Sequence, residues 1–229
     1  MKESIYMIPL NDSFDQNDMC PICFLEKKTE DETLEYCMGP SMMEPDVRQN
    51  SNRTGFCREH LERMLASSNN RLSTALMLLT HVEYVKDAFE KAEKIKGGFM
   101  KKNHTDFSAA IECSSKCIVC KKIRDEIVRY MDTFYYMYKK TKGFAEKLND
   151  CENLCVSHAL KLLEGDKSSD EKLKSAVIKR ITATLEHDIS ELKAFADMFD
   201  YRNCKTDPSA HKDVLPDAIA HLRSKIKQF

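Results

Sequence analysis

The sequence predicts an all-α fold made of two duplicated helical units and a C-terminal helix. Helix-breaking residues are scarce, with six glycines and six prolines among 229 residues. Apolar residues recur at three- and four-residue intervals over several long segments, which is the pattern of amphipathic helices. A pattern of paired cysteines and histidines also occurs twice, at nearly equal spacing. These observations together favour helices arranged in two related units.

The repeated pattern is a CxxC pair followed by a CxxH pair. The second pair follows the first after 33 residues in the first half of the chain and after 34 residues in the second half. Cysteine and histidine at such spacings are typical zinc ligands. The eight residues are Cys20, Cys23, Cys57, His60, Cys117, Cys120, Cys155 and His158.

We expect each CxxC to bind a metal together with the CxxH that follows it, so that the chain holds two Zn²⁺ ions in two Cys3His sites. Thiolate sulfur and imidazole nitrogen suit zinc, and four protein ligands close a tetrahedral site, which favours structural over catalytic ions. The helical pattern resumes directly after each ligand pair. Each ion should therefore join two helix N-termini, where the helix dipole stabilises thiolates.

The predicted organisation has five segments. They are an N-terminal extended arm at 1–17, a first zinc-binding helical unit at 18–96, a junction at 97–114, a second zinc-binding helical unit at 115–203, and a C-terminal loop and helix at 204–229. Within the arm, Ile5–Pro9 has the pattern of an extended segment. Each unit should run from CxxC through a helix and a connection to CxxH, then a short helix and a long helix. We expect all five segments to pack as one compact domain.

Apolar residues expected to face the core mark the main helices. The helix after the first CxxH is marked by Leu72, Leu76, Leu79, Val82 and Phe89. The helix after the second CxxC is marked by Ile123, Ile127, Met131, Phe134 and Met137. The longest helix lies between Gly165 and Pro208, with Leu173, Val177, Ile181, Leu185, Leu192, Phe195 and Phe199 inward. The last helix should begin at Pro216, with Leu215, Ile219, Leu222 and Ile226 inward.

Composition and charge exclude several classes of protein. The chain has ten cysteines but no apolar secretion signal at its start, which favours reduced, metal-bound thiols in the cytoplasm over a disulfide framework. No apolar run is long enough to cross a bilayer. The net charge of −1 does not favour a nucleic-acid partner. The aromatic run at 130–138 is expected to serve packing or a partner surface rather than base stacking.

Two further features are candidate sites. Cys113 and Cys151 each lie four residues before a ligand pair of the second unit, so both should flank one metal site. They are candidates for a redox-responsive pair or for substitute ligands, although two bystander thiols are the favoured interpretation. The connection at 39–55 has the composition of a polar loop and is a candidate ligand site through Glu44, Asp46 and Arg48. Acidic and histidine residues at 186–191 are expected to form a solvated helix face.

The same motifs carry a family resemblance over nearly the whole chain. They include Ile8–Asp12, Cys20–Cys23, Gly39–Pro40, Met43–Arg48, Gly55–His60, Asp132–Phe134, Cys155–His158, Phe199–Asn203 and Pro216–Ile219. In these segments the sequence resembles a bacterial family whose function is unknown. The resemblance implies a soluble bacterial protein with the two CxxC/CxxH sets as its recurring feature, and it brings no catalytic residues.

Three functions remain open at this point. The first is a two-zinc interaction or regulatory protein that binds a protein partner. The second is a thiol-based redox or metal sensor that uses the second metal site with Cys113 and Cys151. The third is an enzyme that uses the 39–55 loop, which is the least favoured because no nucleotide-binding, hydrolase or metalloprotease motif occurs.

Overall fold

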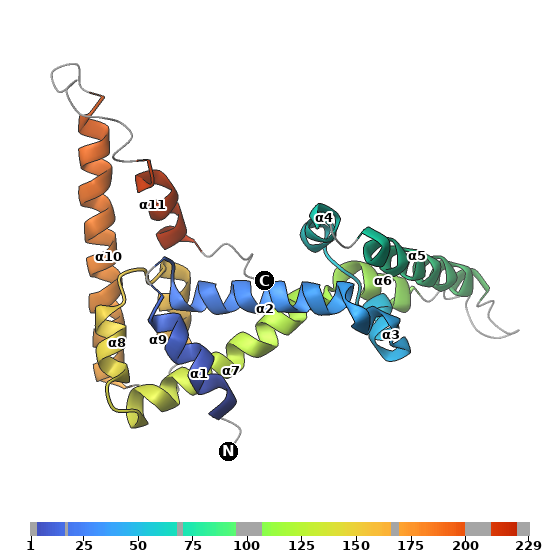
Figure 1. Ribbon diagram of the computed structural model, residues 1–229, viewed down its shortest axis with the longest axis horizontal. Coiled ribbons are helices and arrows are strands. Elements are labelled where there is room, and N and C mark those ends of the chain that lie inside the picture. Colours follow the sequence, from blue (N-terminus) through green and yellow to red (C-terminus); the bar gives the residue numbers. More distant parts are fainter. Residues whose placement is uncertain are drawn as a thin grey trace, which may run out of the picture. The chain divides into compact units, whose positions relative to one another are not determined.

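The computed structural model describes residues 4–16, 18–67, 71–94, 107–165, 170–199 and 212–223. Every regular element in these ranges is helical, as predicted (Figure 1). The helices are α1 (Ser4–Phe14), α2 (Pro21–Met38), η1 (Pro40–Met43), α3 (Pro45–Thr54), α4 (Arg58–Ala66), α5 (Arg71–Lys94), α6 (Ser108–Ser115), α7 (Ile118–Lys140), α8 (Phe144–Asp150), α9 (Val156–Gly165), α10 (Glu171–Asp197) and α11 (Val214–Leu222). None of these helices combines the length and the apolar character that crossing a bilayer requires.

The N-terminal segment is helical, so the prediction of an extended arm at Ile5–Pro9 is wrong. Pro9 lies inside α1 and removes one hydrogen bond, the one to the carbonyl of Ile5 in the exposed first turn. Burial outweighs this loss, because Leu10 and Phe14 lie one helical turn apart and are both buried. Tertiary packing therefore decides the conformation here, against the local preference of proline.

The connection at 39–55 is also helical, so the prediction of an irregular loop is wrong. Pro40 begins the 3₁₀ helix η1 and Pro45 begins α3, each at the first helical position. Proline is favoured there because its missing N–H would have no partner in the first turn and its φ already suits a helix. The prolines that suggested a loop are thus the residues that start two short helices.

The chain forms two compact units, and these are not the consecutive blocks 18–96 and 115–203. Unit 1 contains the described residues of 1–27 and 127–229, and unit 2 contains those of 28–126. The boundaries lie inside α2 and α7 rather than in linkers. Each unit therefore combines segments from both halves of the sequence, where one compact domain was expected.

One order of helices occurs twice along the chain. A short helix, a CxxC, a long helix, one or two short helices, a CxxH, a short helix and a long helix occur from α1 to α5 and again from α6 to α10. In unit 1, α1 packs against α8, and α10 packs against α8 and α9; in unit 2, α6 packs against α3, and α5 packs against α3 and α4. Each opening helix, α1 or α6, thus packs on a helix from the other half of the sequence.

Unit 1 has an aromatic core. Phe134 of α7 is fully buried and contacts the rings of Phe14 and Phe144 at centroid distances of 6.0 and 5.7 Å. Tyr130 is buried as well and meets the ring of Tyr6 edge-on at 5.1 Å. Tyr130 and Phe134 of the aromatic run therefore pack inside the protein. Of the residues predicted to face inward on this helix, Ile123, Ile127, Phe134 and Met137 are buried and Met131 is half-buried.

The long helices α5 and α10 exist as predicted, but parts of their predicted inward faces are wrong. On α5 the buried residues are Thr74, Met77, Ala88 and Ala92, whereas Leu72, Leu79, Val82 and Phe89 are exposed. On α10, Leu173 and Val177 are buried as predicted, together with the polar Thr184 and Asp188. The buried residues mark the side of α5 that packs against its neighbours α3, α4 and α6.

The C-terminal helix α11 also presents an unexpected face. Ala218 and His221 are buried, while Leu215, Ile219 and Leu222 are exposed, so the prediction that these three face inward is wrong. His221 is buried because it hydrogen-bonds to Asp188 of α10, which compensates for its removal from water. The predicted inward residue Ile226 lies outside the described residues.

Candidate metal centres

All four ligand pairs lie at helix starts, in one repeated arrangement. The first ligand of each pair directly precedes a helix, and the second is its third residue. In each case the backbone carbonyl of the first ligand accepts the first helical hydrogen bond, at 2.9–3.0 Å. The two side chains therefore project together from the first turn, beside its free N–H groups and the positive end of the helix dipole. The four helices are α2, α4, α7 and α9.

The eight predicted ligands come together in two groups of four, but with exchanged partners. We name the groups site A, in unit 1, and site B, in unit 2. Site A consists of Cys20, Cys23, Cys155 and His158. Site B consists of Cys57, His60, Cys117 and Cys120. The prediction that each CxxC binds with the next CxxH along the chain is wrong.

The length of α2 explains the exchange. Its 18 residues carry the chain away from Cys20 and Cys23 by about 27 Å at 1.5 Å per residue. The following helix α3 does not return along α2 but packs against α5 and α6 in unit 2. The next CxxH, Cys57 and His60, is thus placed beside the CxxC that follows α6. Similar sequence spacing in the two halves made local pairing look sufficient.

The atoms of site A are spaced as a tetrahedral metal requires. Metal–sulfur bonds of about 2.3 Å and metal–nitrogen bonds of about 2.0–2.1 Å imply S–S distances of about 3.8 Å and S–N distances of about 3.6 Å. The Sγ atoms of Cys23 and Cys155 are 3.8 Å apart. Nδ1 of His158 lies 3.6, 3.4 and 3.2 Å from the sulfurs of Cys20, Cys23 and Cys155. The donor set therefore fits a single tetrahedral ion.

Site B has nearly the same spacing. The Sγ atoms of Cys57 and Cys120 are 3.9 Å apart, and Nδ1 of His60 lies 3.3 and 3.5 Å from the sulfurs of Cys117 and Cys120. The distance from Cys57 Sγ to His60 Nδ1 is shorter, at 2.9 Å. A small outward movement of one of these two side chains brings this pair to the tetrahedral distance as well.

The backbone beside site B is held by a close approach at Gly55. Its carbonyl accepts a hydrogen bond from the N–H of Ile118 at 3.0 Å, which connects the segment before Cys57 to the segment after Cys117. Gly55 has a φ of 73°, and a Cβ atom at this position would overlap the carbonyl oxygen of Cys113. Glycine is therefore required for the two ligand pairs of site B to approach each other.

The close packing of the thiols strongly perturbs their acidity. In site B, a hydrogen bond with Cys120 lowers the pKa of Cys117 to about 3 although burial opposes the shift, and the pKa of Cys120 is raised by the same contact. Burial lowers the pKa of His60, but hydrogen bonds with Cys117 and Glu30 outweigh it and raise that pKa to about 10. Protons are thus shared within a cluster of ligand atoms, which is the arrangement that a divalent cation replaces on binding.

Site A behaves in the same way. The pKa of Cys20 is lowered against the effect of burial by hydrogen bonds with Cys155, Cys23 and His158. The pKa of Cys23 is raised, first of all by its hydrogen bond with Cys155. Burial lowers the pKa of His158, and hydrogen bonds with Cys155, Cys20 and Glu26 outweigh it to give a pKa of about 11. The same kinds of hydrogen bond therefore shift the pKa values of the thiols and the imidazole in both sites.

Each imidazole is held from behind by a buried glutamate. Nε2 of His158 lies 3.0 Å from Oε1 of Glu26, and Nε2 of His60 lies 2.9 Å from Oε1 of Glu30. With Nδ1 on a metal, Nε2–H donates to the carboxylate, which fixes the tautomer and the orientation of the ring. Both glutamates lie on α2, four residues apart.

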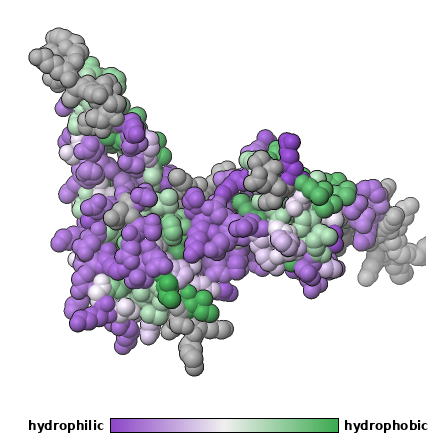
Figure 2. Space-filling model, in the orientation of Figure 1, coloured by the Kyte–Doolittle hydropathy of each residue, from purple (hydrophilic) through white to green (hydrophobic). Residues whose placement is uncertain are grey.

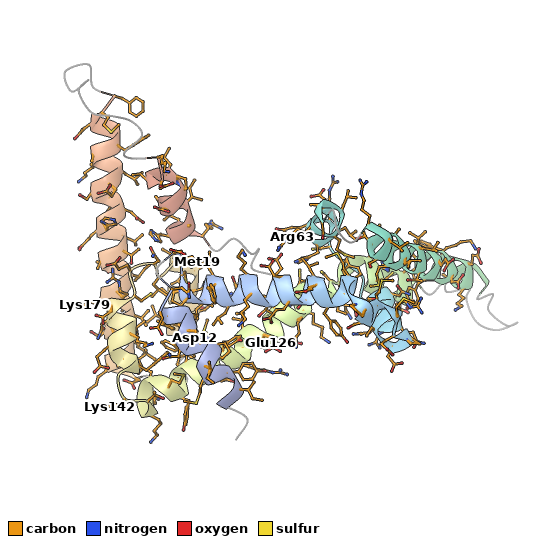
Figure 3. The ribbon with its side chains drawn as sticks, in the orientation of Figure 1. Asp12, Met19, Arg63, Glu126, Lys142 and Lys179 are labelled. Carbon is orange, nitrogen blue, oxygen red and sulfur yellow. The ribbon has the colours of Figure 1, made fainter. Side chains whose placement is uncertain are left out.

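A basic residue completes each arrangement. Lys161 lies 3.5 Å from Glu26, and Arg63 forms an ion pair with Glu30 and a second with Asp31 at 2.5 Å (Figure 3 labels Arg63 on α4). Each basic residue follows its histidine by three positions, one helical turn later. The same Glu–His–base contacts thus occur in both sites.

Neither glutamate is among the site residues predicted from the sequence. Glu26 and Glu30 follow Cys23 by three and seven residues, on the helix face that carries Cys20 and Cys23. At the equivalent positions after Cys120, α7 has the buried residues Ile123 and Ile127. The sequence signal for these glutamates was therefore an acidic residue at each of two positions where the matching helix α7 has an apolar residue.

The predicted pair of Cys113 and Cys151 does not flank one site. Cys113 precedes the ligands Cys117 and Cys120 of site B in unit 2, while Cys151 precedes the ligand Cys155 of site A in unit 1. Both thiols are free and buried. Burial raises the pKa of Cys151 to about 12, so this thiol resists ionisation. The premise of the pair fails because the ligand partners are exchanged.

The residues of the predicted ligand loop lie at the start of α3. Glu44 precedes the helix, Asp46 is in its first turn and Arg48 is one turn further on. Glu44 and Asp46 are exposed and Arg48 is half-buried. An acidic residue in the first turn stabilises the helix dipole, which accounts for Asp46. That these three residues bind a ligand stays a prediction.

Replacing Glu26 or Glu30 by glutamine is expected to lower the affinity for Zn²⁺ by about 10–100-fold at the site of the matching histidine, because the ring loses its orienting carboxylate. Competition with a chelator of known affinity measures this, and Glu32→Gln, on an exposed part of the same helix, is the matched control. Unchanged affinity in both Glu26→Gln and Glu30→Gln would contradict the role assigned to these residues.

A protein-family model matches nearly the whole chain. No curated protein and no solved structure matches the chain. The model of the Family of unknown function (DUF6062) matches residues 1–228. This agrees with the resemblance expected from the CxxC/CxxH motifs, and the chain belongs to this family of unknown function.

Proposed function

We propose that both sites hold Zn²⁺ as a structural ion and that the protein is a zinc-stabilised helical protein that binds a protein partner. One observation carries the zinc assignment: each site presents three thiol sulfurs and one imidazole nitrogen at tetrahedral spacing, with the ring held by a buried carboxylate. Sulfur and imidazole donors in tetrahedral geometry favour zinc among the divalent ions.

A structural role follows from the number of ligands. Catalytic zinc keeps one coordination position for water or substrate, whereas four protein donors occupy all the positions of a tetrahedral ion. In site A, Cys20, Cys155 and His158 are buried, which also separates the ion from solvent. Because thiolate ligands must stay reduced, the cytoplasm of a bacterial cell is the compartment that suits this proposal.

Partner binding is supported by exposed apolar residues on α5. Leu72, Leu79, Val82 and Phe89 lie within an arc of about 100° on this helix and are 73%, 54%, 62% and 54% exposed. Figure 2 shows hydrophobic surface over the N-terminal part of α5. Apolar residues grouped on one face are typical of protein–protein contact sites. The partner expected here is a protein with an apolar surface of its own.

A redox-sensing function is the second candidate, now assigned to the ligands of site B instead of Cys113 and Cys151. Site B has two half-buried thiols, Cys57 and Cys120, whereas site A has one, Cys23. The sulfurs of Cys57 and Cys120 are 3.9 Å apart. Peroxide would oxidise these two thiolates to a disulfide, with its O–O bond reduced to two waters after uptake of two protons, and zinc would be released.

Removal of zinc is expected to lower the melting temperature strongly, because structural zinc contributes on the order of 10–16 kcal/mol of apparent folding free energy per site in small zinc peptides. Elemental analysis should find two zinc ions per chain, and calorimetry before and after strong chelation measures the shift. Protein treated with chelator already saturated with zinc is the control. An unchanged melt after complete metal removal would contradict the structural role.

Loss of one zinc ion per chain after mild peroxide treatment would favour the redox-sensing function.

The α5 face is tested by partner capture. Wild-type protein is expected to retain a specific partner from cell extract, and Leu79→Glu with Val82→Glu should abolish its capture because charges replace the apolar contact. Ile178→Glu with Ile189→Glu changes two equally exposed residues of α10 and is the matched control. Equal capture by all three proteins would exclude α5 as the binding surface.

A further inference from the structure

Unit 1 contains a cavity of about 510 Å³ between α10, α11 and the turn before α9. This volume is within the range of small-molecule sites. It is separate from the metal ligands, since its lining includes Glu152 and Asn153 but none of the residues of site A. α11 follows the second long helix and has no counterpart after α5 among the described helices, so the cavity is a feature of one unit only.

The cavity is lined by a rigid polar network. Nδ1 of His221 lies 2.9 Å from Oδ1 of Asp188, and Nε2 lies 2.9 Å from Oδ1 of Asn153. His221 and Asp188 are buried. Asp188 was expected on a solvated helix face, and instead it anchors α11 to α10. A network with both ring nitrogens occupied keeps its shape when a ligand enters, which lowers the entropy cost of binding.

The lining is strongly acidic and nearly without apolar side chains. Its charged residues are Glu152, Asp188, Glu191, Asp213, Asp217 and Arg180. Five carboxylates against one guanidinium give a formal charge of −4 when the histidines are neutral. Facing carboxylates in a partly enclosed cavity concentrate cations, since their field is focused by the protein walls.

The arrangement does not suit a bare metal ion. Within the described residues, the groups of three or more possible ligands that converge within 4.8 Å are the two Cys/His sets. The carboxylates of the cavity are therefore spread over its walls. A cation large enough to span them is an organic one, with its charge on an amine or guanidinium group.

Arg180 carries the opposite charge to the acidic residues of the lining, so it favours a negatively charged group on the ligand. Its Nη1 donates to the carbonyl of Asn149 at 3.3 Å, which holds the side chain in place. Its Nε is buried and has no hydrogen-bond acceptor among the described residues. Arg180 as a whole is half-buried and lines the cavity, so its guanidinium offers a charged hydrogen-bond donor to a ligand that brings an oxygen.

We propose that this cavity binds a small organic cation that also carries an oxygen acceptor, the chemistry of a free basic amino acid. The amine or guanidinium group is held by carboxylates that include Asp213 and Asp217, and the carboxylate of the ligand approaches Arg180. This proposal does not depend on the α5 surface, and its test is independent of partner capture.

Isothermal titration of the purified full-length protein with L-arginine and L-lysine tests the proposal. Saturable binding with one site per chain is expected for at least one of them. L-citrulline, which lacks the side-chain charge, and agmatine, which lacks the carboxylate, should each bind at least about tenfold more weakly, since one charge-assisted contact is lost. No saturable binding of either basic amino acid would overturn the proposal, as would equal binding of L-citrulline.

Variants locate the binding within the protein. Asp213→Asn with Asp217→Asn removes two exposed carboxylates of the cavity and should weaken binding at least about tenfold without loss of the folded state. Glu186→Gln removes an exposed carboxylate of α10 that does not line the cavity and should leave affinity unchanged. Equal weakening by both changes would mean that net charge alone attracts the ligand, and would overturn the proposed site. Thermal unfolding of each variant verifies that it is folded.

Discussion

The exchange of ligand pairs between the two halves of the chain is the constraint on which the structure depends. Site A takes its CxxC from before α2 and its CxxH from before α9, while site B takes its CxxH from before α4 and its CxxC from before α7. Unit 1 combines residues 1–27 with residues 127–229, whereas unit 2 is the continuous stretch 28–126. An ion at site A would close a loop of about 130 residues and an ion at site B one of about 60. Local pairing would close loops of about forty residues, and longer loops lose more entropy on closure.

Helix α2 has a role in both sites. Its N-terminal end carries Cys20, just before the helix, and Cys23 in the first turn. The same face continues with Glu26 and Glu30, which hold the histidines of site A and site B. A residue such as Glu30 is stable when buried only because His60 and Arg63 compensate its charge, and these contacts lower its pKa although burial opposes this. α7 has isoleucines at both equivalent positions. The two halves are therefore equivalent in helix order but unequal in chemistry.

The sequence was sufficient to predict the helical class, the eight cysteines and histidines that form two possible metal sites, and their positions at helix starts. These features follow from periodicity and from short-range spacing. The sequence was not sufficient to predict which CxxC pair lies beside which CxxH pair, because this depends on where long helices such as α2 place the pairs in space. Local rules also failed at Pro9 and Pro45, since a proline is compatible with a loop, a helix start or an exposed helical turn. Burial of polar Asp188 and His221 could not be predicted because each compensates the other across elements far apart in sequence.

The exchanged pairing is tested most directly by counting zinc ions in double cysteine variants with native mass spectrometry. Cys23→Ser with Cys155→Ser removes two ligands of site A, and one ion per chain should remain. Cys23→Ser with Cys57→Ser removes one ligand from each site, and both ions should be lost or bound far more weakly. The opposite outcome, with both ions lost in the first variant and one ion retained in the second, would show that each CxxC binds with the CxxH that follows it and would contradict the account.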